Sequence, residues 1–355
     1  MKVRHDWLLL IGALAIIGAL YNHYLGHSVL LFELILLAVG SAFGLISAKL
    51  RIGRVDVAKD EGLITRFLSR WLEERTIGVL IPLSGFVLLT AWSVWKVLFT
   101  GETNLRMEDF VVTLFALSLI LYQSAPLKLH EQRDFVILYL MFLTIIFAGI
   151  WKLYSLVTGE SYARITAYSE YYFITIPVVS VVNLFGVDAH AVLNLGGIGL
   201  SNIIEYQYEG RLVRLGIGTG CSGLYSAGLF FSAFLAFVLV RYETVNARIL
   251  AGLGIGLLVT WFSNILRMVV TIVVGSEFGA PALATFHMYF GIIVFICFVL
   301  IFWYFIMRWL DSHMADRLRV IAERASAASQ DATAESTSEP SSNGPRHDEG
   351  DSSEQ

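Results

Sequence analysis

Cysteine and charge are both scarce in this chain. Two cysteines in 355 residues cannot form the disulfide framework of a small secreted protein. Charged residues make up 15% of the chain, whereas a soluble domain has about 25%, so the composition argues against a soluble protein. The formal net charge of −4 gives no sign of a basic surface, and no nucleic-acid partner is expected. Hydrophobic residues make up 56% and the mean hydropathy is +0.69, as in an integral membrane protein.

The apolar residues form long uncharged stretches, which predict membrane helices rather than a barrel. We expect an all-α polytopic membrane protein with about eight transmembrane helices. The predicted ranges are Trp7–Leu25, Ser28–Ala48, Ile77–Phe99, Phe110–Ala125, Phe135–Leu153, Gly220–Val240, Ile249–Val274 and Thr285–Met307. Lys2 and Arg4 precede the first range, as in a signal peptide, but no small-residue cleavage site follows. We therefore expect the first helix to be retained.

Basic residues predict the orientation of these helices. The connection between the second and third ranges carries seven of them: Lys49, Arg51, Arg54, Lys59, Arg66, Arg70 and Arg75. Because cytoplasmic loops are enriched in Lys and Arg, this connection and both termini are expected in the cytoplasm, in a multi-pass protein of the cell membrane. The connection of about residues 154–219 is then external. Its apolar stretch Tyr171–Phe185 would invert everything after it if it spanned, so we expect it to be interfacial or re-entrant.

Two further features divide the chain. Within the predicted external loop, alternating apolar residues in Ile203–Tyr208 and Arg211–Ile217 flank Glu209-Gly210, a pattern that predicts a β-hairpin over the outer mouth of the bundle. Residues 326–355 are rich in Ser, Ala, Glu, Asp, Gly and Pro and contain no aromatic residue. They predict a disordered cytoplasmic tail, which leaves residues 1–325 as the helical catalytic domain.

Cys221 lies in a glycine-rich run, Gly216 to Gly223, where a polar loop enters an apolar helix. A helix N-terminus lowers the pKa of a thiol, and its free N–H groups can form an oxyanion hole. The run is not a phosphate loop, because no Lys-Ser/Thr pair follows. A cysteine in a membrane helix is usually a small hydrophobe, so the thiol alone does not establish catalysis. Cys297 is expected at another depth, which argues against a disulfide.

Arg267 and His287 are expected near the same outer layer as Cys221. An arginine inside an apolar stretch costs about 3 kcal/mol unless it is paired or faces a cavity. Arg267 is therefore either a functional charge or the structural partner of Glu33, in the outer half of the second range. His287 is a candidate acid/base, and it has rivals on the same side in His23, His27 and His190. The scattered histidines and cysteines suggest no metal site, and no cofactor is expected.

These motifs resemble those of one family. Cys221-Ser222-Gly223, Asn264-x-x-Arg267 and His287, with Tyr289 and Gly291 behind it, resemble the exosortase/archaeosortase family over roughly Tyr171 to Met307. Its members are multi-pass, transpeptidase-like enzymes that process secreted proteins with a C-terminal signal of a short motif, a transmembrane helix and a basic cluster. The resemblance implies that Cys221 is the nucleophile, Arg267 its electrostatic partner and His287 the acid/base. The acidic, Ser-rich tail favours an archaeal member.

The resemblance and the residues together predict a membrane-embedded cysteine protease or transpeptidase. It would cleave the C-terminal signal of secreted or surface proteins at the outer membrane face through a thioester. Transfer of the product to a lipid or another amine acceptor would follow, and water as acceptor would make the enzyme a plain protease. Ser222, Gly223, Asn264 and Glu33 are the supporting or substrate-binding candidates, with Glu33 and the hairpin as candidates for positioning Arg267 and gating substrate.

Three alternatives stay open at this point. A transporter or channel would explain Arg267 and Glu33 as an intramembrane pair, although it leaves Cys221 without a role and we find no internal repeat. A non-catalytic scaffold would explain the tail alone. A membrane acyltransferase would share the thioester but take its acyl group from a phospholipid.

Overall fold

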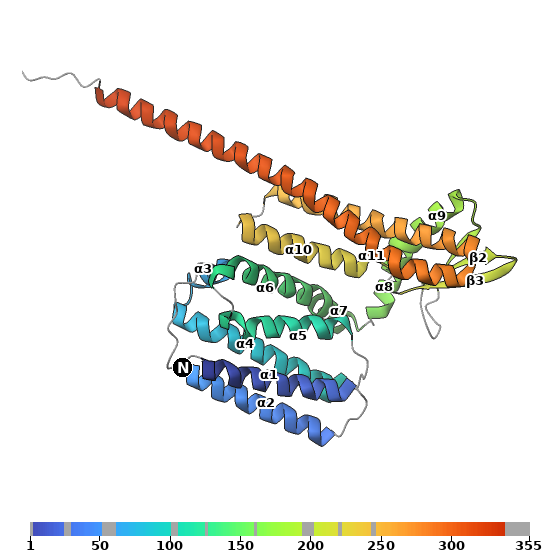
Figure 1. Cartoon of the computed structure of the whole chain (residues 1–355), viewed down its shortest axis with the longest axis horizontal. Helices are drawn as coiled ribbons and strands as arrows, with labels where there is room; N and C mark the ends of the chain where they lie inside the picture. The colour runs from blue at the N-terminus through green and yellow to red at the C-terminus, as the bar shows by residue number, and fades with distance from the viewer. Residues whose placement is uncertain are drawn as a thin grey trace, which may run out of the picture. The chain divides into compact units, whose positions relative to one another are not determined.

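The computed structural model describes most of the chain in two units. The described residues are 3–24, 30–51, 62–100, 106–124, 127–159, 162–193, 202–218, 222–242 and 246–337. The first unit comprises residues 1–299 and the second residues 300–355, and each is described by itself. The described residues are mostly helical, with one small sheet in the first unit (Figure 1).

The N-terminal helices lie side by side (Figure 1). They are α1 (Val3–Tyr24), α2 (Leu30–Arg51), α4 (Glu74–Trp95) and α5 (Met107–Ile120). Ala13, Ile16 and Leu89 belong to the core that these helices share. A Cβ on Gly12 would lie 2.8 Å from the carbonyl oxygen of Gly40, so α1 and α2 approach through their glycines. Small residues at a helix contact are typical of membrane bundles, where close packing holds the helices together.

The next helices contain two π-helical turns. Helix α4 continues into η1 (Lys96–Thr100), and α6 (His130–Thr144) continues through η4 (Ile145–Ile150) into α7 (Trp151–Thr158). Helix α10 (Leu224–Tyr242) packs against α6. The hydrophobic stretches predicted these helices but not the π turns, because apolar content runs unbroken across them.

The predicted hairpin is confirmed. Strands β2 (Asn202–Tyr208) and β3 (Arg211–Ile217) are antiparallel, with Tyr208 opposite Arg211. Glu209 and Gly210 both have positive φ, at 48° and 73°, as the two central residues of a type I′ turn require. A third strand, β1 (Ala189–Leu193), pairs with β2 and was not predicted, since its five residues carry no alternating pattern.

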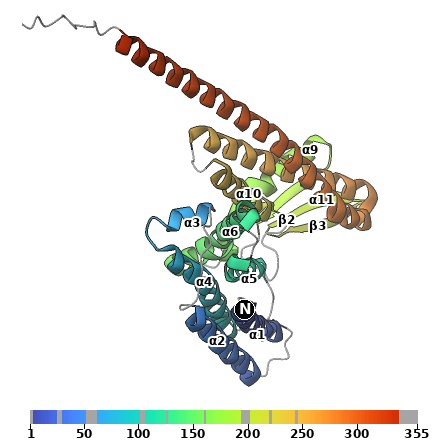
Figure 2. The ribbon, with the colours of Figure 1, turned by 60° about the vertical axis from the view of Figure 1, so that its left-hand side comes forward.

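The predicted loop also contains helices. Helix α8 (Tyr162–Glu170), η5 (Tyr171–Thr175) and α9 (Ile176–Leu184) follow one another, so the stretch Tyr171–Phe185 is helical almost to its end. Val178 and Val182 share one core with Ile204 of β2 and Ile272 of α11 (Ala247–Thr337). Figure 2 shows β2 and β3 beside α11. This stretch therefore helps to hold the sheet against α11.

Helix α11 is interrupted at Gly279, whose φ of 81° and ψ of 179° are not helical. The predicted ranges Ile249–Val274 and Thr285–Met307 lie before and after this break. In the second unit the helix continues to Thr337, so the expectation of a disordered tail from residue 326 is wrong for residues 326–337. Four of its twelve residues are Ala, the residue that most favours helix. Residues 338–355 lie outside the described residues.

The described residues include four helices that are long and apolar enough to cross a membrane. They are Thr76–Phe99, His130–Thr158, Leu224–Tyr242 and Ala247–His287, and two shorter apolar helices span Leu8–Tyr24 and Glu33–Gly44. These lengths are compatible with the predicted helical membrane protein. The predicted total of eight spans is not confirmed by the described residues.

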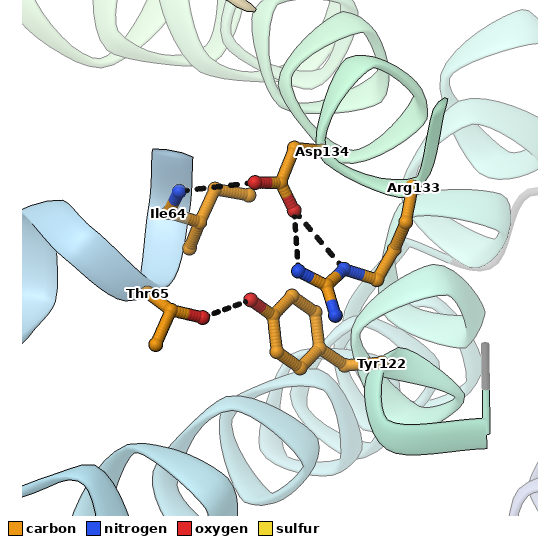
Figure 3. Close-up of polar contacts among 5 residues, drawn as sticks. All are labelled: Ile64, Thr65, Tyr122, Arg133 and Asp134. Carbon is orange, nitrogen blue, oxygen red and sulfur yellow. Dashed lines mark hydrogen bonds and ion pairs between the residues drawn. The ribbon is translucent and has the colours of Figure 1, made fainter. Parts of the chain in front are cut away.

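A buried ion pair ties the short helix α3 (Leu63–Leu68) to the start of α6 (Figure 3). Asp134 is fully buried and accepts from Arg133 Nε at 3.0 Å and Nη2 at 2.9 Å. Its other oxygen accepts from the Ile64 N–H at 3.1 Å. The Arg133 guanidinium carbon lies 3.9 Å from the centre of the Tyr122 ring, and the Tyr122 hydroxyl is 2.7 Å from Thr65 Oγ1.

We expect Asp134→Ala to destabilise the protein strongly. It leaves the buried Arg133 and the Ile64 N–H without their acceptor, and breaking a buried pair costs about 3–5 kcal/mol. Asp134→Asn keeps an oxygen for one donor and should cost less. Thermal unfolding in detergent measures both. The control is Arg214→Ala, which breaks an exposed pair with Glu205 at 2.8 Å and should change little. Equal shifts for Asp134→Ala and Arg214→Ala would contradict this account.

Candidate functional site

Cys221, the predicted nucleophile, lies outside the described residues, but both ends of its segment are described. The Ser222 N–H donates to the carbonyl oxygen of Gly218 at 3.0 Å. This hydrogen bond joins the end of strand β3 to the residue that follows Cys221 in the chain. The segment that carries the thiol is therefore anchored directly to the sheet.

Gly223 is the N-cap of α10. Its carbonyl oxygen accepts from the Ala227 N–H at 2.9 Å, and the Leu224 N–H lies 3.4 Å from Ser222 Oγ, its acceptor. Gly223 has φ of +79°, a left-handed conformation that favours glycine. The helix begins at Leu224, later than the predicted Gly220, so Cys221 precedes the helix instead of opening it.

The start of α10 meets α11 at Asn264. A Cβ on Gly223 would lie 2.6 Å from Asn264 Cγ, so the two residues are in close contact. Asn264 is buried, and within the described part of the chain its Nδ2 has no hydrogen-bond partner. Arg267 follows Asn264 by three residues, on the same face of the helix. The turn after Cys221 thus lies against the part of α11 that carries Arg267.

Arg267 and His287 lie on either side of the break at Gly279 and interact electrostatically. His287 is half-buried. The neighbours of Arg267 along the helix, Met268 and Ile265, pack in the core beneath the sheet. The structure therefore relates the described members of the predicted site through one contact, from Gly223 to Asn264, and one electrostatic interaction, between Arg267 and His287.

Glu33 lies elsewhere. It is fully buried at the start of α2, where Asn22 Nδ2 donates to its Oε1 at 3.4 Å and His23 Nδ1 lies 3.5 Å from its Oε2. The end of α1 supplies these partners of Glu33, so the structure does not support the alternative in which Glu33 pairs with Arg267. His23 belongs to this pair, exposed His190 lies 3.4 Å from Asp188, and His27 lies outside the described residues.

The sequence analysis missed a buried carboxyl beside Ser222. Glu170 at the end of α8 is 7% exposed, and its carboxyl group is hydrogen-bonded to the Ser222 side chain. Asn202, the first residue of β2, donates from Nδ2 to Glu170 Oε2 at 3.2 Å and to the carbonyl oxygen of Ala167 at 3.0 Å. Burial raises the pKa of Glu170, and the two side-chain hydrogen bonds oppose that rise. The available signal was a lone acid directly before the apolar run from Tyr171.

Arg267 and His287 bring side chains that could support acyl transfer. In the part of the chain that the structure describes, no three His, Cys, Asp or Glu residues gather closely enough to hold a metal ion. Arg267 brings a permanent charge that suits a developing oxyanion. His287 brings a side chain that can give and take a proton near neutral pH.

Comparisons of this chain with protein-family models, with curated proteins and with solved structures gave no match.

We expect Gly223→Ala to disrupt this site. The new methyl group would meet Asn264, and alanine disfavours a φ of +79°, so a loss of about 1–3 kcal/mol is expected. Gly254→Ala on α11 is the matched control, because a Cβ there meets nothing within 4 Å, and it should stabilise the helix by about 0.5–1 kcal/mol. Thermal unfolding compares them. Similar effects of the two substitutions would show that the Gly223–Asn264 contact is not as tight as described.

Proposed function

We propose that this protein is a membrane-embedded cysteine protease or transpeptidase that cleaves the C-terminal sorting signal of secreted proteins. One observation carries the proposal: Gly223, two residues after Cys221, touches Asn264, one turn before Arg267, which in turn interacts with His287. The first two motifs are thus in contact, and the third interacts electrostatically with the second. A structural role for each residue alone would not require that association.

The proposed topology places this site at the outer membrane face. Eight spans, with both termini in the cytoplasm, put Cys221, Arg267 and His287 near one external layer. The helices and strands of residues 154–218 would then stand on the outer side. The proposed substrate helix lies beside the bundle and presents its recognition motif to this layer.

The proposed reaction begins with attack on the substrate. The Cys221 sulfur, as thiolate, adds to the scissile carbonyl carbon and forms a tetrahedral oxyanion. Arg267 stabilises that oxyanion, because its guanidinium is always charged and a site that excludes water strengthens the interaction. The C–N bond then breaks, His287 protonates the leaving amine, and a thioester remains on Cys221.

The second half of the reaction resolves the thioester. An amine acceptor, proposed to belong to a lipid, loses its proton to His287 as its nitrogen attacks the thioester carbonyl. Collapse of the intermediate forms an amide and returns the thiolate. A protein anchored by a transmembrane helix would become a protein anchored by lipid. Attack by water would instead release the protein from the membrane.

We expect Cys221→Ala to abolish processing. The substrate is a secreted reporter that ends in a transmembrane helix and a basic cluster, co-expressed with the enzyme and followed by size and membrane attachment. The control is Cys297→Ala, which removes the exposed free thiol of α11 and should leave processing intact. Processing that survives Cys221→Ala, in a reporter that depends on the wild-type enzyme, would exclude a Cys221 thioester.

We expect Arg267→Lys to lose most activity, although the charge is retained. Lysine presents a point charge in place of the planar guanidinium fork, and a lost oxyanion contact costs about 10²–10³ in kcat. Single-turnover rates on the same reporter, with thermal unfolding of the variant as a folding check, measure the effect. Near-normal turnover by a folded Arg267→Lys variant would remove the proposed oxyanion contact.

A further inference from the structure

Glu170 differs from the other buried carboxyl groups. Glu33 lies against His23, Asp109 lies 3.1 Å from Lys96 Nζ, and Asp134 lies 2.9 Å from Arg133 Nη2. The side-chain partners of Glu170 among the described residues are Ser222 and Asn202, and both are neutral. A buried carboxylate without a basic partner is costly, and such a group usually takes up a proton instead.

The hydrogen bonds between Glu170 and Asn202 are incomplete in a way that indicates where this proton sits. Asn202 Nδ2 donates to Glu170 Oε2, so the two side chains are already joined at one end. Glu170 Oε1 and Asn202 Oδ1 are both buried, and neither has a hydrogen-bond partner among the residues that the structure describes. Ionised carboxylate oxygens and amide oxygens only accept hydrogen bonds, so these two atoms cannot satisfy each other without a hydrogen between them.

We propose that Glu170 is a carboxylic acid in the resting protein, with its proton on Oε1 donated to Asn202 Oδ1. The two side chains then form a two-point pair, with Asn202 Nδ2–H donating to Oε2 and Oε1–H donating to Oδ1. One proton satisfies both buried oxygens and removes the uncompensated charge. The end of α8 and the start of β2 are held together by this pair.

The surroundings of Glu170 agree with a neutral group. Asn202 of β2 and Ser222 meet Glu170 with neutral side chains, and Glu205 of β2 is paired with Arg214. Helix α10 presents Tyr225, whose phenol interacts electrostatically with Glu170. Arg106 and Glu108 of α5 act on the same phenol with opposite charges. On α7, which packs against α8, Lys152 lies over the Trp95 ring at 4.1 Å from its centre. Burial is the main cause of the raised pKa of Glu170, ahead of the two hydrogen bonds.

The protonated pair gives Glu170 a positioning role. Ser222 hydrogen-bonds to Glu170 through its side chain and follows Cys221 in the chain, so the state of Glu170 acts on the segment that carries the thiol. Ionisation would remove the proposed donor on Oε1 and would weaken the pair. This role rests on the proposed function, whereas the proton on Glu170 does not.

Infrared difference spectroscopy of the full-length protein tests the proton directly. We expect a protonated-carboxyl C=O band at neutral pH that shifts with ¹³C-labelled glutamate and disappears in Glu170→Gln. Asp134→Asn is the control and should leave the band in place, because Asp134 is paired with Arg133. Asn202→Ala should move the band to higher frequency by removing the Nδ2 hydrogen bond, which assigns it even if Glu170→Gln fails to fold. A spectrum without such a band would overturn the proposal.

The pH dependence of stability gives a second test. The folded protein holds a proton on Glu170 that the unfolded chain releases. The contribution of this proton to the free energy of unfolding is therefore full at acidic pH and is lost as pH rises through the folded pKa of Glu170. Gln has a donor and an acceptor in the same places as the protonated acid. We therefore expect the melting temperature of the wild type to decrease as pH rises. The melting temperature of Glu170→Gln should decrease less over the same pH range. A Glu170→Gln variant with the same slope as wild type would contradict the proposal.

Activity separates the positioning role from the proposed function. In the reporter assay, Glu170→Gln should process substrate at neutral pH and lose less activity than wild type as pH rises. A folded Glu170→Gln variant without activity would show that the site needs an ionised Glu170, which overturns the role. Cys221→Ala should lose processing but keep the infrared band. If the wild type itself does not process the reporter, the proposed function fails. The infrared band then still tests whether Glu170 is protonated.

Discussion

Buried carboxyl groups that need partners constrain how the helices of this protein pack. Each of them joins two elements that apolar packing alone would hold less firmly in place. Glu33 joins α1 and α2, and Asp109 joins α5 to η1 through Lys96. Asp134 joins α6 to α3, and Glu170 joins α8 to β2. Apolar contact is tolerant of small shifts, whereas an unpartnered buried carboxylate is strongly unfavourable. These contacts therefore fix the positions of helices whose closeness is set by small residues and apolar side chains.

The elements that were predicted correctly are those fixed by local chemistry. Glu209-Gly210 predicted the hairpin because two consecutive positive φ angles are a property of the turn itself. The long helices followed from continuous apolar stretches. Strand β1 was missed because its five residues gain their structure from pairing with β2, and the π turns were missed because nothing in hydrophobicity marks them. The helix at residues 326–337 shows that a polar composition without aromatics can still favour helix when alanine is abundant.

The site illustrates a different limit. The predicted topology placed Cys221, Arg267 and His287 near one outer layer, and the contact of Gly223 with Asn264 and the electrostatic interaction of Arg267 with His287 are consistent with that grouping. Depth in a membrane does not say which side of a helix a residue occupies, and for that reason Glu33 was matched with Arg267 instead of His23. Glu170 was overlooked because an acid in a predicted external loop is normally solvated, and only tertiary packing on Asn202 and Ser222 buries it.

The two residues after Cys221 are held from two directions. The Ser222 side chain is hydrogen-bonded to Glu170 at the end of α8, and Gly223 is in close contact with Asn264 on α11. Ser222 is also tied to the sheet through the carbonyl oxygen of Gly218. A reactive group displaced by about 1 Å can lose about 10²-fold in rate. Under the proposed mechanism, the contacts made by Ser222 and Gly223 would therefore contribute to positioning the Cys221 thiol.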